Sequence, residues 1–341
     1  MTAPPLVLVL NAGSSSLKYQ VVEPLSGRAV LKGVIERVDP GQAEATAARV
    51  LDQLASSGLH SADLAGVGHR VVHGGPEFTT PAVIDDDVLT RIDSLSRLAP
   101  LHNPPAVAGI RAAVRALPEL TQVAVFDTAF FSDLPDAAAA YALDRRLTAR
   151  LEIRRYGAHG TSHAYVAGEA ARFLGRDTGD LDQIVLHLGN GASAAAIRGG
   201  VPVDTSMGLT PLEGLVMGTR GGDLDPGVLL YLLRHGDLDL DGLEDLLHHR
   251  SGLVGLSGHH DFREVIGAMD AGGVEARAAY DIYCHRLRKY VGAYLAVLGG
   301  ADVVTFTAGV GENVARLRGG VLSGLERLGI RIDPERNESL Y

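Results

Sequence analysis

Apolar residues along the chain occur in two patterns, short continuous runs and longer segments with helical spacing. The short runs are rich in Val and Ile and end at Gly, Asn or Asp, which predicts strands. They cover Leu6–Leu10, Leu17–Val22, Ala29–Val38, Val67–Val72, Thr121–Phe126, Gln183–Leu188, Ser193–Ile197 and Val303–Thr307. The spaced segments predict helices over Ala43–Ser56, Asp86–Leu98, Pro105–Leu117, Ser162–Leu174, Gly227–Arg234, Leu240–His249, Phe262–Ala271, Glu275–Leu298 and Val314–Leu328. Their alternation predicts an α/β protein.

An internal repeat divides the chain into halves. A shift of 178 residues places Val7–Ser15 over Val185–Ser193, with identical residues at Val7, Leu8, Leu10, Gly13 and Ser15. Each copy predicts a buried strand, a tight turn and a second strand. The alternative is that any two apolar strands ending in a Gly turn look alike. The repeat predicts a duplicated two-domain fold, with residues 1–150 and 151–341 each forming a mixed β-sheet flanked by helices and a cleft between the halves.

Composition narrows the class of protein. The 341 residues include 31 basic and 41 acidic side chains, a formal charge of −10, which argues against nucleic acid and anionic membranes as partners. The single cysteine, Cys284, excludes an intramolecular disulfide, and no apolar run approaches the ~20 residues of a membrane span. We therefore expect a soluble cytoplasmic protein.

Two related Gly-rich turns follow predicted strands. In Asn11–Lys18, small residues let backbone N–H groups converge, while Ser14, Ser16 and Lys18 add donors and a charge, which suits a phosphate. His187–Ser193 is the second such turn. Each is also compatible with a plain hairpin, since Asn-Gly is a strong hairpin signal. Together they could hold a polyphosphate from both sides.

A third turn, Thr307–Asn313, leaves a strand and opens a helix. Close backbone approach at Gly309 and Gly311 suits a base or ribose, and a helix N-terminus favours an anion. A strand-to-helix turn without a ligand is the alternative.

Four polar residues stand where chemistry is expected. Arg70 lies in a strand that ends in a double Gly, and Arg220 lies among glycines, so each could clamp an oxyanion or form a salt bridge. Asp127 ends a buried strand, a usual place for a metal-binding or positioning acid and also for a cap. His159 stands between two glycines before a helix and could donate to a phosphoryl group, whereas His163 on that helix is interpreted as packing or capping.

These motifs, in order, resemble the acetate kinase family, the acetokinases, in the superfamily that also holds sugar kinases, actin and heat-shock chaperone ATPases. The resemblance covers nearly the whole chain. It is carried by Asn11–Lys18, His69–Gly75, Ala99–Pro105, Phe126–Thr128, Arg155–His163, His187–Ser193, Thr210–Gly214, Gly218–Pro226, Asp261–Arg263 and Gly309–Asn313.

The resemblance implies reversible phosphoryl transfer between ATP and acetate, giving ADP and acetyl phosphate, with Mg²⁺ or Mn²⁺, an ATP cleft between the halves and a homodimer. It implies that Arg70 holds the carboxylate, that His159 and Arg220 stabilise the phosphoryl group, and that Asp127 is an acid/base or metal-positioning group. Because a carboxylate is already ionised at pH 7, we favour positioning for Asp127.

The resemblance also implies the binding residues. Asn11 matches a position near the metal. The nucleotide positions are Ser14, Ser16, Lys18, His187, Leu188, Gly189, Asn190, Gly191, Asp261, Phe262, Arg263, Gly309, Val310, Gly311, Glu312 and Asn313. The small acyl pocket matches Val72, Leu101, Ala158 and Pro211. This apolar set disfavours a sugar, which would need polar partners.

Two departures from the family pattern modify these expectations. The family usually has Phe where this chain has Ala158, so we expect a larger pocket that tolerates propionate, and also butyrate, better than a Phe-bearing relative does. The family also continues beyond the segment that here ends at Tyr341, through a glutamate associated with Mg²⁺. The alternatives to acetate kinase are therefore a propionate or short-chain acyl kinase, or a truncated nucleotide-binding product without activity.

Overall fold

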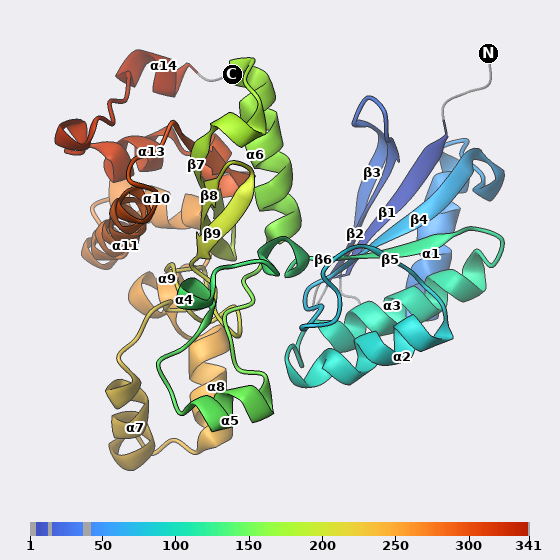
Figure 1. Cartoon of the computed structure of the whole chain (residues 1–341), viewed down its shortest axis with the longest axis horizontal. Coiled ribbons are helices and arrows are strands. Elements are labelled where there is room, and N and C mark those ends of the chain that lie inside the picture. Colours follow the sequence, from blue (N-terminus) through green and yellow to red (C-terminus); the bar gives the residue numbers. More distant parts are fainter. Residues whose placement is uncertain (1–4, 13–15, 37–41, 340–341) are drawn as a thin grey trace. The chain divides into compact units, whose positions relative to one another are not determined.

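The computed structural model describes residues 5–12, 16–36 and 42–339 (Figure 1). Ser14 and the end of the predicted strand Ala29–Val38 lie outside the described residues. Contacts divide the chain into two compact units, Met1–Ser132 (unit 1) and Asp133–Tyr341 (unit 2). No helix of the described part is long and apolar enough to cross a membrane.

Unit 1 is built on a six-stranded mixed sheet in the order β3-β2-β1-β4-β6-β5. β1, β4 and β6 are parallel, whereas β2, β3 and β5 pair antiparallel with their neighbours. The strand bounds are β1 Leu6–Ala12, β2 Ser16–Glu23, β3 Arg28–Glu36, β4 Leu64–Val71, β5 Ala82–Val83 and β6 Gln122–Phe126. The helices are α1 Ala43–Ser56, α2 Asp86–Ser94 and α3 Asn103–Ala116, with 3₁₀ turns η2 Ser61–Asp63, η3 Leu95–Arg97 and η4 Ala129–Phe131.

The core of unit 1 follows from the alternation along its strands. Leu8 and Leu10 of β1, and Leu17, Tyr19 and Val21 of β2, point to the same face of the sheet because side chains alternate with a period of two. Helices α1 and α3 pack beside each other, and their residues Val50, Leu54, Ala113 and Leu117 belong to the same cluster. At the carboxyl ends of β1, β4 and β6, the residues are more polar than in this core.

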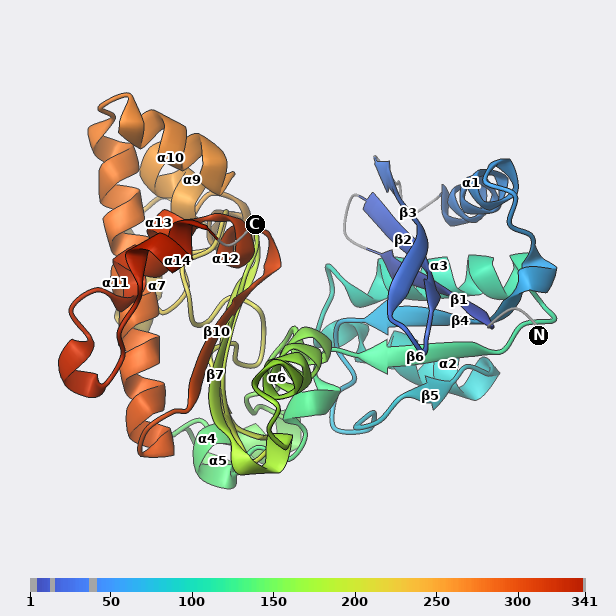
Figure 2. The same ribbon diagram turned by 90° about the horizontal axis from the view of Figure 1, so that it is seen from above.

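Unit 2 contains a four-stranded mixed sheet in the order β10-β7-β8-β9. Its strands are β7 Asp182–Leu188, β8 Ala192–Arg198, β9 Val201–Thr205 and β10 Val303–Thr307. The helices are α4 Asp136–Ala139, α5 Arg145–Leu151, α6 Gly160–Leu174, α7 Pro226–His235, α8 Leu240–His249, α9 Gly252–Ser257, α10 Phe262–Asp270, α11 Val274–Leu298, α12 Ala308–Asn313, α13 Ala315–Leu322 and α14 Pro334–Glu338, with 3₁₀ turns η5 Thr178–Asp180 and η6 Glu326–Leu328. α6 covers one face of the sheet and α11 the other (Figures 1 and 2).

The two sheets repeat one connection. β1 pairs antiparallel with the next strand, β2, and parallel with β4, while β7 pairs antiparallel with β8 and parallel with β10. The internal repeat of the sequence thus corresponds to two related hairpins, one per unit. The predicted fold class, two mixed sheets flanked by helices, is confirmed.

Residues 133–150 belong to unit 2 by their contacts, although the repeat placed them in the first half. α4 packs on β9, and the backbone N–H of Arg155 donates to the carbonyl of Ala139 at 2.7 Å. The segment before α6 is therefore anchored to the second sheet.

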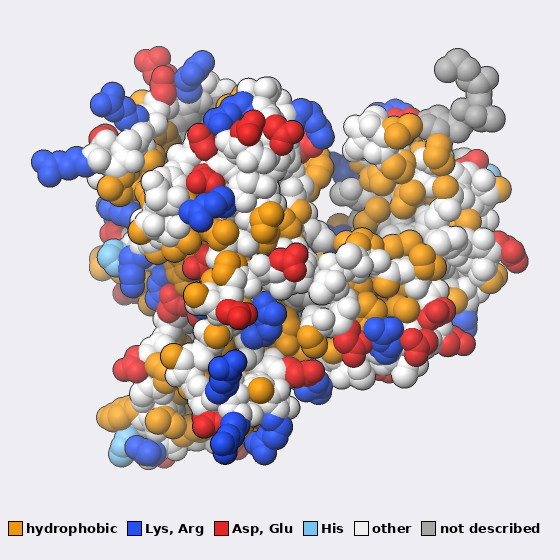
Figure 3. All heavy atoms as spheres, viewed as in Figure 1, with side chains coloured by type: hydrophobic (Ala, Val, Ile, Leu, Met, Phe, Trp, Pro, Cys, Tyr) orange, Lys and Arg blue, Asp and Glu red, His pale blue; other side chains and the backbone are white. Residues whose placement is uncertain are grey.

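Charges of both signs are interspersed over the face in Figure 3, with no extended area of basic side chains. Many exposed arginines have an acidic neighbour, for example Arg91 with Glu77 and Arg111 with Asp93. Such exposed pairs contribute about 0–1 kcal/mol each to stability. Arg70 and Arg220, two of the candidate site residues, are partly buried instead.

Candidate active site

Three polar side chains of unit 1 meet at the carboxyl ends of its parallel strands. Asn11 lies near the end of β1, Arg70 near the end of β4, and Asp127 directly follows β6. Nε of Arg70 donates to Oδ2 of Asp127 at 2.9 Å, and Nη2 donates to the same oxygen. Nη1 of Arg70 donates to Oδ1 of Asn11 at 2.9 Å. In open α/β sheets, ligands bind at this edge, so the cluster is a candidate ligand site.

The charge of Arg70 is balanced within the protein. The Asp127 side chain is fully buried, and that of Arg70 is 30% exposed. Burial by itself would lower the pKa of Arg70, but the charge of Asp127 and the hydrogen bond to it raise this pKa overall. A guanidinium has five N–H groups. After these three bonds, one N–H remains on each terminal nitrogen, which suits the two oxygens of a carboxylate.

The oxygen ligands near Arg70 show whether this cluster could hold a magnesium ion. Among the described residues, no group of three or more His, Cys, Asp or Glu side chains is arranged to hold a metal. The oxygens of Asp127 and Asn11 both face Arg70. Mg²⁺ usually takes only one or two protein oxygens and completes its shell with water and substrate phosphates. Asp127 and Asn11 therefore fit an ion that arrives with a nucleotide, but not an ion held by protein alone.

The segment after β4 carries the predicted apolar contacts. Val72 is buried, and Leu101 is 38% exposed. The side-chain amide of Asn103 donates to the carbonyl of His73 at 3.0 Å and accepts from the His73 backbone N–H at 3.2 Å. These two bonds fix the chain directly after Val72. Lys18 is exposed on β2, opposite Asn11 in the hairpin register.

A group of histidines gathers around the first turn of α6 in unit 2. His159 precedes the helix with a left-handed φ of 58°, a conformation that costs a non-Gly residue about 1–3 kcal/mol and concentrates at functional sites. Its ring stacks on that of His187, with centroids 4.2 Å apart. Ser162 Oγ lies 2.8 Å from Nδ1 of His187. The helix start and the end of β7 therefore hold the two rings together.

His159 and Arg220 converge on the turn between β7 and β8. A Cβ atom placed on Gly191 would lie 3.0 Å from Nη2 of Arg220 and 3.6 Å from Nε2 of His159. Glycine thus leaves the backbone here open to both side chains. An anion beside Gly191 would meet a guanidinium and an imidazole at once.

Arg220 differs from Arg70 in forming no ion pair with a carboxylate among the residues that the structure describes. Nη1 of Arg220 donates to the carbonyl of Pro211 at 2.9 Å, and no carboxylate of the described residues forms an ion pair with Arg220. Burial lowers the pKa of Arg220, with no opposing charge. Within the described part of the chain, Arg220 is therefore a desolvated cation that no carboxylate pairs, which suits a group that binds an anion.

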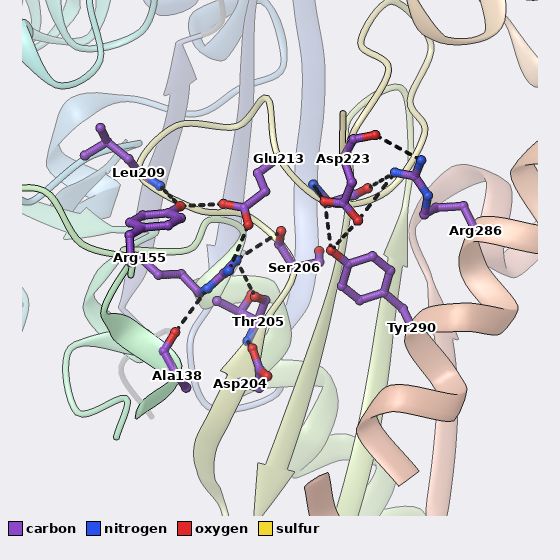
Figure 4. Close-up of polar contacts among 12 residues, drawn as sticks. Ala138, Arg155, Asp204, Thr205, Ser206, Leu209, Glu213, Asp223, Arg286 and Tyr290 are labelled. Carbon is purple, nitrogen blue, oxygen red and sulfur yellow. Dashed lines mark hydrogen bonds and ion pairs between the residues drawn. The ribbon is translucent and has the colours of Figure 1, made fainter. Parts of the chain in front are cut away.

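The loop that carries Pro211 and Arg220 is fixed at its first part by a polar network (Figure 4). Nη2 of Arg155 donates to Oε1 of Glu213 at 2.8 Å, and the Tyr141 hydroxyl donates to Oε2. Nη1 of Arg155 also donates to the carbonyl of Thr205 at 3.1 Å. Burial and the neighbouring Glu213 raise the pKa of Tyr141 well above its usual value, so the hydroxyl keeps its proton.

The far part of the same loop is held by α11. The Gly214 N–H donates to Oδ1 of Asp223 at 2.8 Å, and the Tyr290 hydroxyl lies 3.0 Å from Oδ2 of Asp223. Nη1 of Arg286 donates to the Gly214 carbonyl at 2.6 Å (Figure 4). A loop without regular secondary structure is thus immobilised at both ends around Arg220.

A pocket of about 790 Å³ lies between segments of unit 2 that are far apart in the sequence. This volume lies within the roughly 300–1,000 Å³ of small-molecule sites. The lining includes eight of the residues predicted for a nucleotide: Gly189, Asn190, Asp261, Phe262, Arg263, Gly309, Val310 and Asn313. It adds Leu253, His260 and Val314, which the sequence analysis missed because no motif marks them.

Several predicted nucleotide residues, including Asp261 of the pocket lining, also serve the local structure. Oε1 of Glu312 accepts hydrogen bonds from Thr307 Oγ1 and the Ala308 N–H at 2.9 and 3.0 Å. Gly311 lies against Phe306 and Leu188, and Leu188 is completely buried. Hydrogen bonds from the side chain and backbone of Arg263 lower the pKa of Asp261 to about 2, and Asp261 caps α10.

Comparison with known proteins gives a consistent result. The family model described as the acetokinase family matches residues 40–340. An acetate kinase from Porphyromonas gingivalis is 39% identical, with a TM-score of 0.92 over 98% of this chain and 90% of that one.

The chain belongs to the acetokinase family.

Two further solved structures match over nearly the whole of this chain. A propionate kinase from Francisella tularensis is 39% identical, with a TM-score of 0.92 over 98% of this chain and 91% of that one. An acetate kinase from Entamoeba histolytica is 31% identical, with a TM-score of 0.86 over 98% and 90%. Membership identifies the chain as a kinase, an enzyme that uses ATP.

The predicted residues of the acyl pocket differ in how far they are buried. Ala158 is 3% exposed and belongs to the apolar core of unit 2. Pro211 is partly exposed, and its carbonyl accepts from Arg220. Ala158 is therefore packed against the core, next to His159 in the sequence.

Proposed function

We propose that this acetokinase transfers the γ-phosphoryl group of ATP to a short aliphatic carboxylate, acetate or propionate, giving ADP and an acyl phosphate. The observation that carries the proposal is the convergence of Arg220 and His159 on Gly191. A guanidinium without a counter-charge, beside an imidazole and an open backbone, suits the transferring phosphoryl group.

The acceptor is assigned to Arg70. One oxygen of the carboxylate attacks the γ-phosphorus, a new O–P bond forms, and the bond from phosphorus to the oxygen bridging to the β-phosphate breaks, so that ADP leaves with the electron pair. The carboxylate is ionised at pH 7, and a general base is not needed. The two remaining N–H groups of Arg70 suit the two oxygens of this carboxylate. Asp127 accepts two bonds from Arg70 and thereby orients it.

Stabilisation of charge is assigned to unit 2. Phosphoryl transfer depends on positioning and on positive charge around the equatorial oxygens rather than on covalent chemistry of the protein. Arg220 supplies the charge, and Nε2 of His159 faces the same point. Asp127 and Asn11 would hold a Mg²⁺ ion that arrives with ATP, and such an ion would supply further positive charge at the phosphates. The pocket beside Asn190, Phe262 and Gly309 is assigned to the nucleoside.

The size of the acyl group is a second part of the proposal. Ala158 leaves the position beside His159 with a small side chain, and solved relatives include acetate kinases and a propionate kinase. We infer that propionate is accepted alongside acetate. The homodimer expected from the family resemblance stays a prediction.

The test is acyl phosphate formation, trapped as hydroxamate, with ATP and Mg²⁺ across formate, acetate, propionate and butyrate. We expect turnover with its maximum at acetate or propionate. Binding of ATP by the folded chain without turnover would contradict the proposal and favour a nucleotide-binding protein without kinase activity.

A further inference from the structure

One hydroxyl connects two of the histidines near the candidate phosphoryl site. Ser193 Oγ lies 2.9 Å from Nδ1 of His159 and 2.7 Å from Nε2 of His163. Ser193 belongs to β8, opposite His187 of β7, and is completely buried. Its position is fixed by the sheet, whereas His159 and His163 come from the start of α6.

The inner histidine is neutral. His163 is completely buried, and burial together with His187 lowers its pKa to about 3. A neutral imidazole has one N–H donor and one acceptor nitrogen. His163 therefore either donates to Ser193 or accepts from it.

The single hydroxyl proton leaves two arrangements for a neutral His159. In one, His163 donates to Ser193 Oγ, and the hydroxyl donates to Nδ1 of His159, whose proton is then on Nε2. In the other, His159 donates from Nδ1, the hydroxyl donates to His163, and Nε2 of His159 presents a lone pair. Nε2 is the nitrogen near Gly191 and Arg220. A lone pair there would repel a phosphoryl oxygen, whereas an N–H would donate to it.

We propose that Ser193 is a positioning residue that, with His163 behind it, holds neutral His159 with its proton on Nε2 and directs this N–H to the phosphoryl group. The inference rests on the proposed function for its ligand. It goes beyond that function because it assigns the directions of the hydrogen bonds from His163 through Ser193 to His159. Since the residue that orients an imidazole also selects its tautomer, losing it affects the chemical step more than binding.

The tautomer can be observed without turnover. Full-length protein labelled with ¹⁵N-histidine is examined by long-range ¹H–¹⁵N NMR with acetyl phosphate as the probe, and the His159 signals are assigned by their loss in His159→Gln. We expect the Nε2–H tautomer in the wild type and a mixture in Ser193→Ala. A ring protonated on Nδ1 alone, or on both nitrogens, in the wild type would overturn the proposal. Because this measurement needs no activity, its result is separate from that of the kinase assay.

Kinetics provide a second measurement. Ser193→Ala is expected to lower kcat by about 10²-fold, the scale of a misplaced catalytic group, with KM for ATP and acetate nearly unchanged. Ser193→Thr keeps the hydroxyl and should restore most of kcat. Thr46→Val in α1 removes another buried hydroxyl, which donates to the Gln42 carbonyl at 2.9 Å, and serves as the control. A Ser193→Ala enzyme with wild-type kcat, or an equal loss in Ser193→Thr, would show that the hydroxyl does not position His159.

Discussion

Two partly buried arginines, one in each unit, are held in opposite ways. Arg70 shares its charge with fully buried Asp127 and an amide, and its pKa is raised. Arg220 donates to a carbonyl and has a lowered pKa. The first group is already electrostatically complete, and the second becomes so only when an anion binds. The difference suits Arg70 to orienting a substrate and Arg220 to binding one.

The largest effect is expected for Arg220, which no carboxylate of the described residues pairs. Arg220→Gln should lower kcat by about 10³–10⁵-fold, the range measured for arginines that stabilise phosphoryl transfer. Its melting temperature should stay near that of the wild type, because no carboxylate is left unpaired. Hydroxamate assays and circular dichroism melts measure the two effects. Arg172→Gln, which removes an exposed arginine paired with Glu169, is the control.

Removing the paired arginine should instead reduce stability. Arg70→Gln leaves the charge of Asp127 buried, which costs about 3–5 kcal/mol when one partner of a buried pair is lost. Adding Asp127→Asn should recover most of this loss, since both charges are then absent. Denaturant unfolding of the two single variants and the double variant measures the coupling. A double variant no more stable than Arg70→Gln would mean that the pair does not control the stability of unit 1.

A pH effect is expected in the histidine group of unit 2. The folded-state pKa of His163 is about 3, below the ~6.5 of an unfolded histidine. The unfolded state thus binds more protons between these values, so stability is full above about pH 6.5 and falls, by an amount on the order of a few kcal/mol, as pH drops toward 3. His163→Gln should flatten this slope. An unchanged slope in melts between pH 7 and 5 would exclude His163 as its cause.

The smallest effect concerns the acyl group and tests whether the surroundings of His159 also select the substrate. Ala158→Phe should raise the ratio of kcat/KM for acetate to that for propionate by about ten-fold, near the lower limit for one methylene group. Because Ala158 is packed in the core, Ala158→Val provides a milder step that should shift the ratio in the same direction. An unchanged ratio in both folded variants would contradict the pocket assignment.

The long elements were predictable because their patterns are strong. The helix Glu275–Leu298 appears as α11, Val274–Leu298, and the strand Val303–Thr307 appears unchanged as β10. The predicted helix Val314–Leu328 was wrong in its second half, because α13 ends at Leu322 and Gly324 follows with a φ of 84°. Short elements such as β5 and α9 were missed, since a few residues show no periodicity.

The site was predictable only where a residue follows a motif. Asp127 and Arg70 could be proposed from the sequence because they lie where strands end. Ser193 looked like part of a hairpin, and His163 was interpreted as packing or capping, because their contact with each other depends on how α6 packs on the second sheet. Likewise, Arg155 and Glu213 are 58 residues apart, and no local pattern connects them.

The central claim is that Arg220 is reserved for the phosphoryl group. Calorimetric titration with acetyl phosphate and with acetate, on the wild type and Arg220→Gln, tests it directly. We predict that Arg220→Gln weakens the binding of acetyl phosphate by more than about ten-fold, as expected for losing a hydrogen bond to a charged group worth about 1.5–3 kcal/mol. The binding of acetate should stay unchanged. Equal affinity of both proteins for acetyl phosphate would contradict the claim.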